Sequence, residues 1–78
     1  MIETLEDWLI ARVAADAGLH LCEVDAQTPL YRYGLDSRTL AFIVENAERR
    51  FGLVADLDRI SPAEPISALV RALAPLPA

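Results

Sequence analysis

One segment, residues 37–51, has a clearer hydrophobic pattern than any other part of the chain. Its apolar side chains follow the i, i+3, i+4, i+7 spacing that places them on one face of an α-helix: Leu40, Ile43, Val44, Ala47 and Phe51. Asp36 precedes the segment and belongs to a residue type that caps helix N-termini, and Gly52 follows it as a typical C-terminal stop. We therefore predict a helix over residues 37–51 with one buried face.

The residues that lead into this helix determine where one hydroxyl group lies. Gly34 supplies backbone freedom for a bend, and Leu35 and Leu40 fit a hydrophobic staple that sets the angle of the incoming chain. With Asp36 as the N-cap, Ser37 occupies the first helical position, near free amides and the positive end of the helix dipole. This environment suits a covalently attached phosphate group, so Ser37 is our candidate functional residue.

Two other segments also have helical spacing. The first, about residues 4–17, has a stripe formed by Leu5, Leu9 and Val13. The second, about residues 62–74, has a buried face formed by Ile66, Leu69, Val70 and Leu73. Two starts compete for this last helix. Ser61 and Pro62 resemble a cap and a first helical residue, whereas Pro65 lacks the amide that a continuing first turn would use.

A long connection, residues 18–36, joins the first two helices, and a compact domain tolerates such a connection only if it packs or functions. Three apolar side chains can anchor it over the core: Leu19, Leu21 and Val24. Thr28 before Pro29 resembles a cap followed by a first helical position. We therefore expect a short helical turn over residues 29–33, which brings Gly34 to its bend in a fixed position.

The chain has 78 residues, enough for one domain, and we predict a single domain over residues 1–78. A composition of 54% apolar and 24% charged residues is that of a globular protein and not of a disordered one. The net charge of -5 disfavours binding to nucleic acid and to anionic membranes. An acidic surface favours partners that present basic docking patches.

Reactive side chains are few. Cys22 is the only cysteine and His20 the only histidine, so the sequence predicts no internal disulfide and no metal site. His20 lies in a different loop from Ser37, and no third group orients it as a base, so we expect no hydrolytic activity. The chain has no apolar run of transmembrane length and no signal-peptide pattern, which favours a cytoplasmic location.

Four stretches together resemble the acyl or peptidyl carrier protein family. They are Gly34-Leu35-Asp36-Ser37, the helix up to Phe51-Gly52-Leu53, the approach Thr28-Pro29-Leu30, and the late Pro65-Ile66 followed by Leu69 and Leu73. The resemblance covers nearly the whole chain. It implies an all-α, four-helix bundle with a long first loop, in which a short third helix at about residues 54–60 joins the three main helices. Leu57 and Ile60 would anchor that short helix.

The resemblance also implies a function. In this family the serine after Gly-Leu-Asp carries 4′-phosphopantetheine, whose thiol holds cargo as a thioester. That serine is Ser37 here, with Asp36, Gly34 and Leu35 as the other residues of the attachment motif. The implied partners are a phosphopantetheinyl transferase, a cargo-loading acyltransferase or adenylating ligase, and downstream synthase or tailoring enzymes. We expect a freestanding, monomeric carrier with no catalytic activity of its own.

The chain departs from the family on the second helix. Relatives usually have an apolar residue directly after the serine and another where Glu45 stands, and often an acid where Phe42 stands, whereas Arg38 follows the serine here. We hypothesise that Arg38, Phe42 and Glu45, joined by Glu48 and Arg49, form a docking face specific to this protein's partners. The alternative is that Phe42 packs against the preceding loop.

Three functions remain open. The first is an acyl carrier of polyketide or related specialised metabolism. The second is an aminoacyl or peptidyl carrier of a nonribosomal peptide-type pathway. The third, from another class, is a diverged helical interaction module whose serine is never modified, and Arg38 beside Ser37 is its best support.

Overall fold

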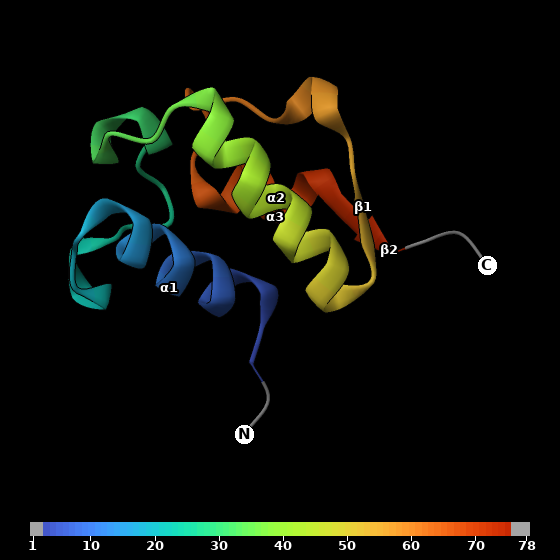
Figure 1. Cartoon of the computed structure of the whole chain (residues 1–78), viewed down its shortest axis with the longest axis horizontal. Coiled ribbons are helices and arrows are strands. Elements are labelled where there is room, and N and C mark those ends of the chain that lie inside the picture. Colours follow the sequence, from blue (N-terminus) through green and yellow to red (C-terminus); the bar gives the residue numbers. More distant parts are fainter. Residues whose placement is uncertain (1–2, 76–78) are drawn as a thin grey trace.

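The computed structural model describes residues 3–75, so the ends of the predicted domain, residues 1–2 and 76–78, lie outside the described residues. The described residues form three α-helices: α1 (Leu5–Ala17), α2 (Ser37–Phe51) and α3 (Ile66–Ala72). Short 3-10 helices cover Leu21–Glu23, Leu30–Tyr33 and Leu57–Arg59. Two short strands, β1 (Leu53–Ala55) and β2 (Leu73–Pro75), pair at the side where the described chain ends (Figure 1). The mostly helical fold is the predicted class, a small helical bundle, with a sheet that the sequence analysis did not predict.

Helix α1 begins and ends at local signals and packs on both other helices. The Thr4 hydroxyl accepts a hydrogen bond from the Asp7 amide at 3.0 Å, which caps the N-terminus. At the other end, Gly18 stops the helix in a left-handed conformation, with φ 71°. Near the start of the helix, the Trp8 ring meets the Phe51 ring edge to face, with centroids 6.0 Å apart. Glu3 also pairs with Arg50 at 2.9 Å, so the start of α1 is joined to the end of α2.

The core lies where the three helices and the long connection meet. Its largest fully buried side chains come from all four segments: Leu9, Val13, Leu30, Leu40, Ile43, Val44, Ile66 and Leu69. Among the described residues no polar or charged side chain is buried. Burial of apolar surface is therefore the main term that holds α2 in place.

The long connection is fixed at several points. Leu30 and Val24 are buried, but Leu21, predicted as an anchor, is 60% exposed, because it lies in a 3-10 turn that faces solvent. The Tyr33 hydroxyl accepts a hydrogen bond from the Asp25 amide at 2.8 Å, which ties the middle of this segment to its later part. The amides of Leu30 and Tyr31 donate to the carbonyls of Glu64 and Pro62, so the connection also holds the segment before α3.

The short helix predicted at about residues 54–60 is present only in part, as the 3-10 helix Leu57–Arg59, because the start of that range lies in a strand. Leu53–Ala55 forms strand β1, which pairs antiparallel with β2 in the register Leu53 to Pro75 and Ala55 to Leu73. Asp56 then caps a 3-10 turn by accepting a hydrogen bond from the Asp58 amide at 3.2 Å. Ile60 packs against the core as predicted, whereas Leu57 is 74% exposed and anchors nothing.

The last helix is shorter than the predicted range of 62–74. Residues 61–64 form a turn in which the Ser61 hydroxyl accepts from the Ala63 amide at 3.0 Å. Pro65 is the N-cap in an extended conformation, so the second of the two candidate starts is close to the observed one. After Ala72 the backbone becomes extended, because Leu73 and the two residues after it pair with β1.

Candidate functional site

The start of α2 has the predicted geometry. Asp36 is extended, with φ -97° and ψ 176°, and its Oδ1 accepts a hydrogen bond from the Thr39 amide at 2.8 Å. Its carbonyl accepts from the Leu40 amide at 3.0 Å, which is the first bond of the helix. Leu35 and Leu40 are both buried in the core cluster, so the predicted staple residues hold the incoming chain against the bundle.

Gly34 provides the bend just before this cap. It has φ +79°, a left-handed conformation that side-chain-bearing residues rarely adopt. An added Cβ there would meet no heavy atom within 4 Å, so the position requires glycine for its backbone conformation and not for lack of space. The bend places Ser37 on an exposed corner.

The hydrogen bond that Asp36 accepts as the helix cap lowers the pKa of its carboxyl group. The pKa of Asp36 lies below its ordinary value, chiefly because the Thr39 backbone amide donates to the carboxylate, with a smaller contribution from the charge of Arg38. A carboxyl whose pKa is lower in the folded state than in the unfolded state stabilises the fold above the unfolded pKa, about 3.9. That contribution is lost as the pH falls through the lower, folded-state pKa.

We therefore expect Asp36→Asn to reduce the acid sensitivity of the fold. Asparagine also caps helices but does not titrate in this range, so the other carboxyls should account for all of the variant's remaining acid sensitivity. The measurement is the urea midpoint of both proteins at neutral pH and at a pH below 3. Equal losses of midpoint in the two proteins would show that Asp36 contributes nothing to the pH dependence.

The three serine hydroxyls of the chain differ in whether they are hydrogen-bonded within the fold. Ser61 accepts from the Ala63 amide, and Ser67 Oγ donates to Gln27 Oε1 at 3.2 Å. Ser37 is exposed, and its hydroxyl has no hydrogen-bond partner within residues 3–75. It is therefore available to a modifying enzyme.

Ser37 also lies beside a groove between α2 and the segment after β1. The groove has a volume of about 480 Å³ and is lined by Ser37, Leu40, Ala41, Val44, Glu45, Glu48, Leu57, Ile60 and Pro62. Most of these side chains are apolar. An exposed hydroxyl on a fixed corner, next to helix-terminal amides and a groove, fits a covalently attached, flexible phosphate-linked arm.

The residues predicted as a docking face lie on two sides of α2. Arg38 and Phe42 line a hollow toward α1, together with Arg12, Asp16 and Thr39, whereas Glu45 and Glu48 line the groove on the other side. The predicted set is therefore not one continuous face.

Individual members of this set have different roles. Phe42 is 61% exposed, and the Arg12 guanidinium lies 5.9 Å from its ring centroid, so the alternative in which Phe42 packs against the preceding loop is wrong. Glu45 and Arg49 form an exposed ion pair on consecutive turns of α2. Glu48 accepts a hydrogen bond from the Ala55 amide at 2.9 Å, so its carboxylate holds β1 against α2.

Sequence reasoning missed Arg12. Its Nε pairs with Asp16 one turn further along α1, a spacing that the sequence does contain, but its contact with Phe42 joins two helices. No local pattern marks such a contact. The other missed element is the pairing of Glu48 with β1, which the sequence analysis did not predict as a strand.

Two further properties bear on the kind of site. Over residues 3–75 no helix is both long and apolar enough to cross a membrane. In the same residues no three His, Cys, Asp or Glu side chains come together in a group that could hold a metal ion.

A family model described as "Phosphopantetheine attachment site" matches residues 7–73 of the chain. The match extends from α1 to the first residue of β2 and includes the capped start of α2. Comparisons with curated proteins and with solved structures gave no match.

Proposed function

The chain belongs to the phosphopantetheine attachment family, whose members bind covalently attached 4′-phosphopantetheine, and on that premise we propose that Ser37 is the attachment residue. The observation that carries the proposal is that Ser37 is exposed at the N-terminus of α2, inside the matched range, and that its hydroxyl has no hydrogen-bond partner among the described residues. Domains of this family generally act as non-catalytic carriers.

The chain's own residues would present the hydroxyl and do no further chemistry. Asp36 and Gly34 hold the corner on which Ser37 stands, and Leu35 ties that corner to the core. A phosphopantetheinyl transferase would transfer the 4′-phosphopantetheinyl group of coenzyme A to Ser37 Oγ: the Oγ–P bond forms as the pyrophosphate bond of coenzyme A breaks, 3′,5′-adenosine bisphosphate leaves, and a base of the transferase takes the hydroxyl proton. The resulting phosphodiester would lie next to the free amides of the helix. When bound, the arm supplies a terminal thiol that holds cargo as a thioester.

Tethering is the physical contribution of such a carrier. Holding the cargo on a short arm raises its effective concentration at the active site of a docked enzyme, and weak contacts allow exchange between successive partners. We propose a freestanding, monomeric and catalytically inactive carrier that is loaded in the cytoplasm, where coenzyme A is available. We assign it to polyketide or related specialised metabolism, with an aminoacyl or peptidyl carrier as the alternative, because Arg38, Phe42 and Glu45 depart from the residues usual in the family.

The test is the intact mass of the full chain after incubation with coenzyme A and a broad-specificity phosphopantetheinyl transferase. We expect a gain of one phosphopantetheinyl group, located by proteolysis and mass spectrometry on the fragment that contains Ser37. No gain on a folded chain would favour the unmodified interaction module, for which Arg38 directly after Ser37 is the supporting feature.

A further inference from the structure

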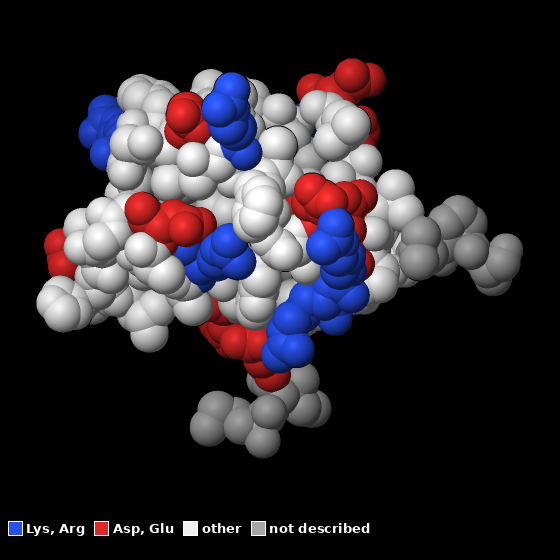
Figure 2. All heavy atoms as spheres, in the orientation of Figure 1, with Lys and Arg blue, Asp and Glu red and all other residues white. Residues whose placement is uncertain are grey.

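A second hollow, on the opposite side of α2 from the groove, combines an exposed aromatic ring with two guanidinium groups. This α1–α2 hollow has a volume of about 300 Å³ and is lined by Arg12, Asp16, Arg38, Thr39 and Phe42. Figure 2 shows this face of the molecule, where both basic and acidic side chains surround uncharged surface at the meeting of α1 and α2. A cationic site is unexpected on a chain of net charge -5.

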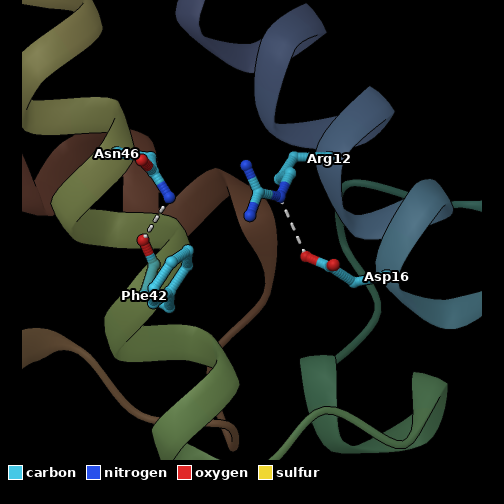
Figure 3. Close-up of polar contacts among 4 residues, drawn as sticks. All are labelled: Arg12, Asp16, Phe42 and Asn46. Carbon is cyan, nitrogen blue, oxygen red and sulfur yellow. Dashed lines mark hydrogen bonds and ion pairs between the residues drawn. The ribbon is translucent and has the colours of Figure 1, made fainter.

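Only part of the Arg12 guanidinium is hydrogen-bonded within its own helix. Its Nε donates to Asp16 Oδ2 at 3.0 Å, and no other hydrogen bond of its guanidinium is found within residues 3–75. Figure 3 shows the terminal nitrogens turned away from Asp16, toward the space between the helices. An arginine side chain has five N–H donors, so Arg12 retains the pair of terminal amino groups that a carboxylate can engage.

Phe42 forms the apolar part of the hollow. Its ring is 61% exposed and lies beneath the Arg12 guanidinium at 5.9 Å. Asn46 donates to the Phe42 carbonyl at 2.9 Å, so the amide nitrogen next to the ring is already used within α2 (Figure 3). A large exposed ring beside arginine has the composition of an interface hot spot.

Arg38 extends the cationic character toward the attachment residue. It is exposed and pairs with no carboxylate within residues 3–75. The lining of the hollow therefore has two guanidinium groups and one carboxylate, that of Asp16, while the carboxylate of Asp36 lies outside the lining but near enough to interact with the charge of Arg38. Because Arg38 follows Ser37 in the chain, a protein that fills the hollow would stand beside the attachment site and leave the groove on the other side of α2 open.

We propose that the α1–α2 hollow docks a partner enzyme through a carboxylate flanked by an apolar side chain, the carboxylate pairing with Arg12 and Arg38 and the apolar group covering Phe42. The proposal rests on the carrier function and names the chemistry of one partner surface. The two arginines of the hollow favour an acidic partner surface at this place. The net charge of the whole chain, by contrast, favours partners that present basic patches. Bidentate pairing with a guanidinium sets orientation as well as affinity, which suits transient docking next to Ser37.

The test uses the full, unmodified, isotope-labelled chain and two blocked peptides, one built from leucine and glutamate and the other with lysine in place of every glutamate. In amide NMR titrations we expect the glutamate peptide to shift resonances around Arg12, Arg38 and Phe42. Arg12→Gln should weaken this binding about tenfold, the expected effect of losing a charged hydrogen bond. Phe42→Ala should weaken it about fivefold through the loss of aromatic contact.

Two control variants test whether the peptide recognises the hollow itself or any exposed aromatic ring or arginine. Tyr31→Ala removes a ring of similar exposure, 56%, from another segment, and Arg71→Gln removes an exposed guanidinium from α3. Both variants should bind the glutamate peptide as the parent does.

Three results would overturn the proposal: no glutamate-peptide shifts in the hollow, equal binding by Arg12→Gln, or the same shifts with the lysine peptide. A change in these resonances on dilution without peptide would instead assign the hollow to a second copy of the chain. Because the titration uses unmodified protein, failure of Ser37 to be loaded counts against the proposed function and not against the docking site.

Discussion

Ser37→Ala is expected to abolish loading by a phosphopantetheinyl transferase completely while leaving the fold intact. The reaction needs an oxygen nucleophile at this corner, and alanine has none. The substitution should cost little stability, since Ser37 is exposed, its hydroxyl bonds to nothing within residues 3–75, and alanine is the best helix former. Intact mass measures loading, and far-ultraviolet circular dichroism measures the fold.

Ser61→Ala and Ser67→Ala are the matched controls for this experiment. Each removes a hydroxyl that is already hydrogen-bonded within the fold, to the Ala63 amide and to the Gln27 side chain respectively. Both variants should be loaded to the parent's level. A phosphopantetheinyl group that still appears on a folded Ser37→Ala chain would place the attachment on another residue and remove the basis of the proposed function.

The sequence predicts α2 well because both of its ends depend on neighbouring residues. The Asp36 side chain caps the first turn, and Gly52 ends the helix with φ +66°. The buried face between them follows a single period, so no distant contact is needed to locate it. The corner that carries Ser37 is predictable for the same reason, since Gly34 and Asp36 act on adjacent backbone.

The C-terminal part of the chain is less predictable because its structure depends on pairing between distant segments. Strands β1 and β2 have three residues each, too few for an alternating pattern to be recognised. Their pairing makes the start of the expected short helix a strand, leaves a 3-10 helix at Leu57–Arg59, and ends α3 at Ala72. Only Pro65, which acts locally, indicates where α3 begins.

The side of α2 that faces α1 likewise has features that local sequence predicts and others that depend on distant residues. Helical spacing correctly places Phe42 outside the buried stripe, where it is 61% exposed. It does not predict that Arg12 of α1 lies over the ring or that Glu48 bonds to the Ala55 amide. The chemistry of the α1–α2 hollow therefore becomes visible only when the helices are packed.

Ile43→Ala is expected to cause the largest loss of stability among substitutions on α2. Ile43 is fully buried on the inner face of the helix, so its truncation removes apolar contacts and leaves a cavity, at a cost of about 2–5 kcal/mol. A domain of this length has a free energy of unfolding of about 4–12 kcal/mol, so the variant loses a large fraction of the total. Urea denaturation followed by circular dichroism measures the loss.

The neighbouring residue supplies the control. Phe42→Ala removes more atoms, but Phe42 is 61% exposed and its ring contacts the Arg12 guanidinium, an interaction worth about 0.5–1 kcal/mol at exposed sites. The smaller truncation should therefore cost at least twice as much as the larger one. Equal losses would mean that α2 is not oriented with Ile43 inward and Phe42 outward. Since that orientation also turns Arg38 toward α1 and Ser37 toward the groove, the same result would remove the structural basis of both proposals.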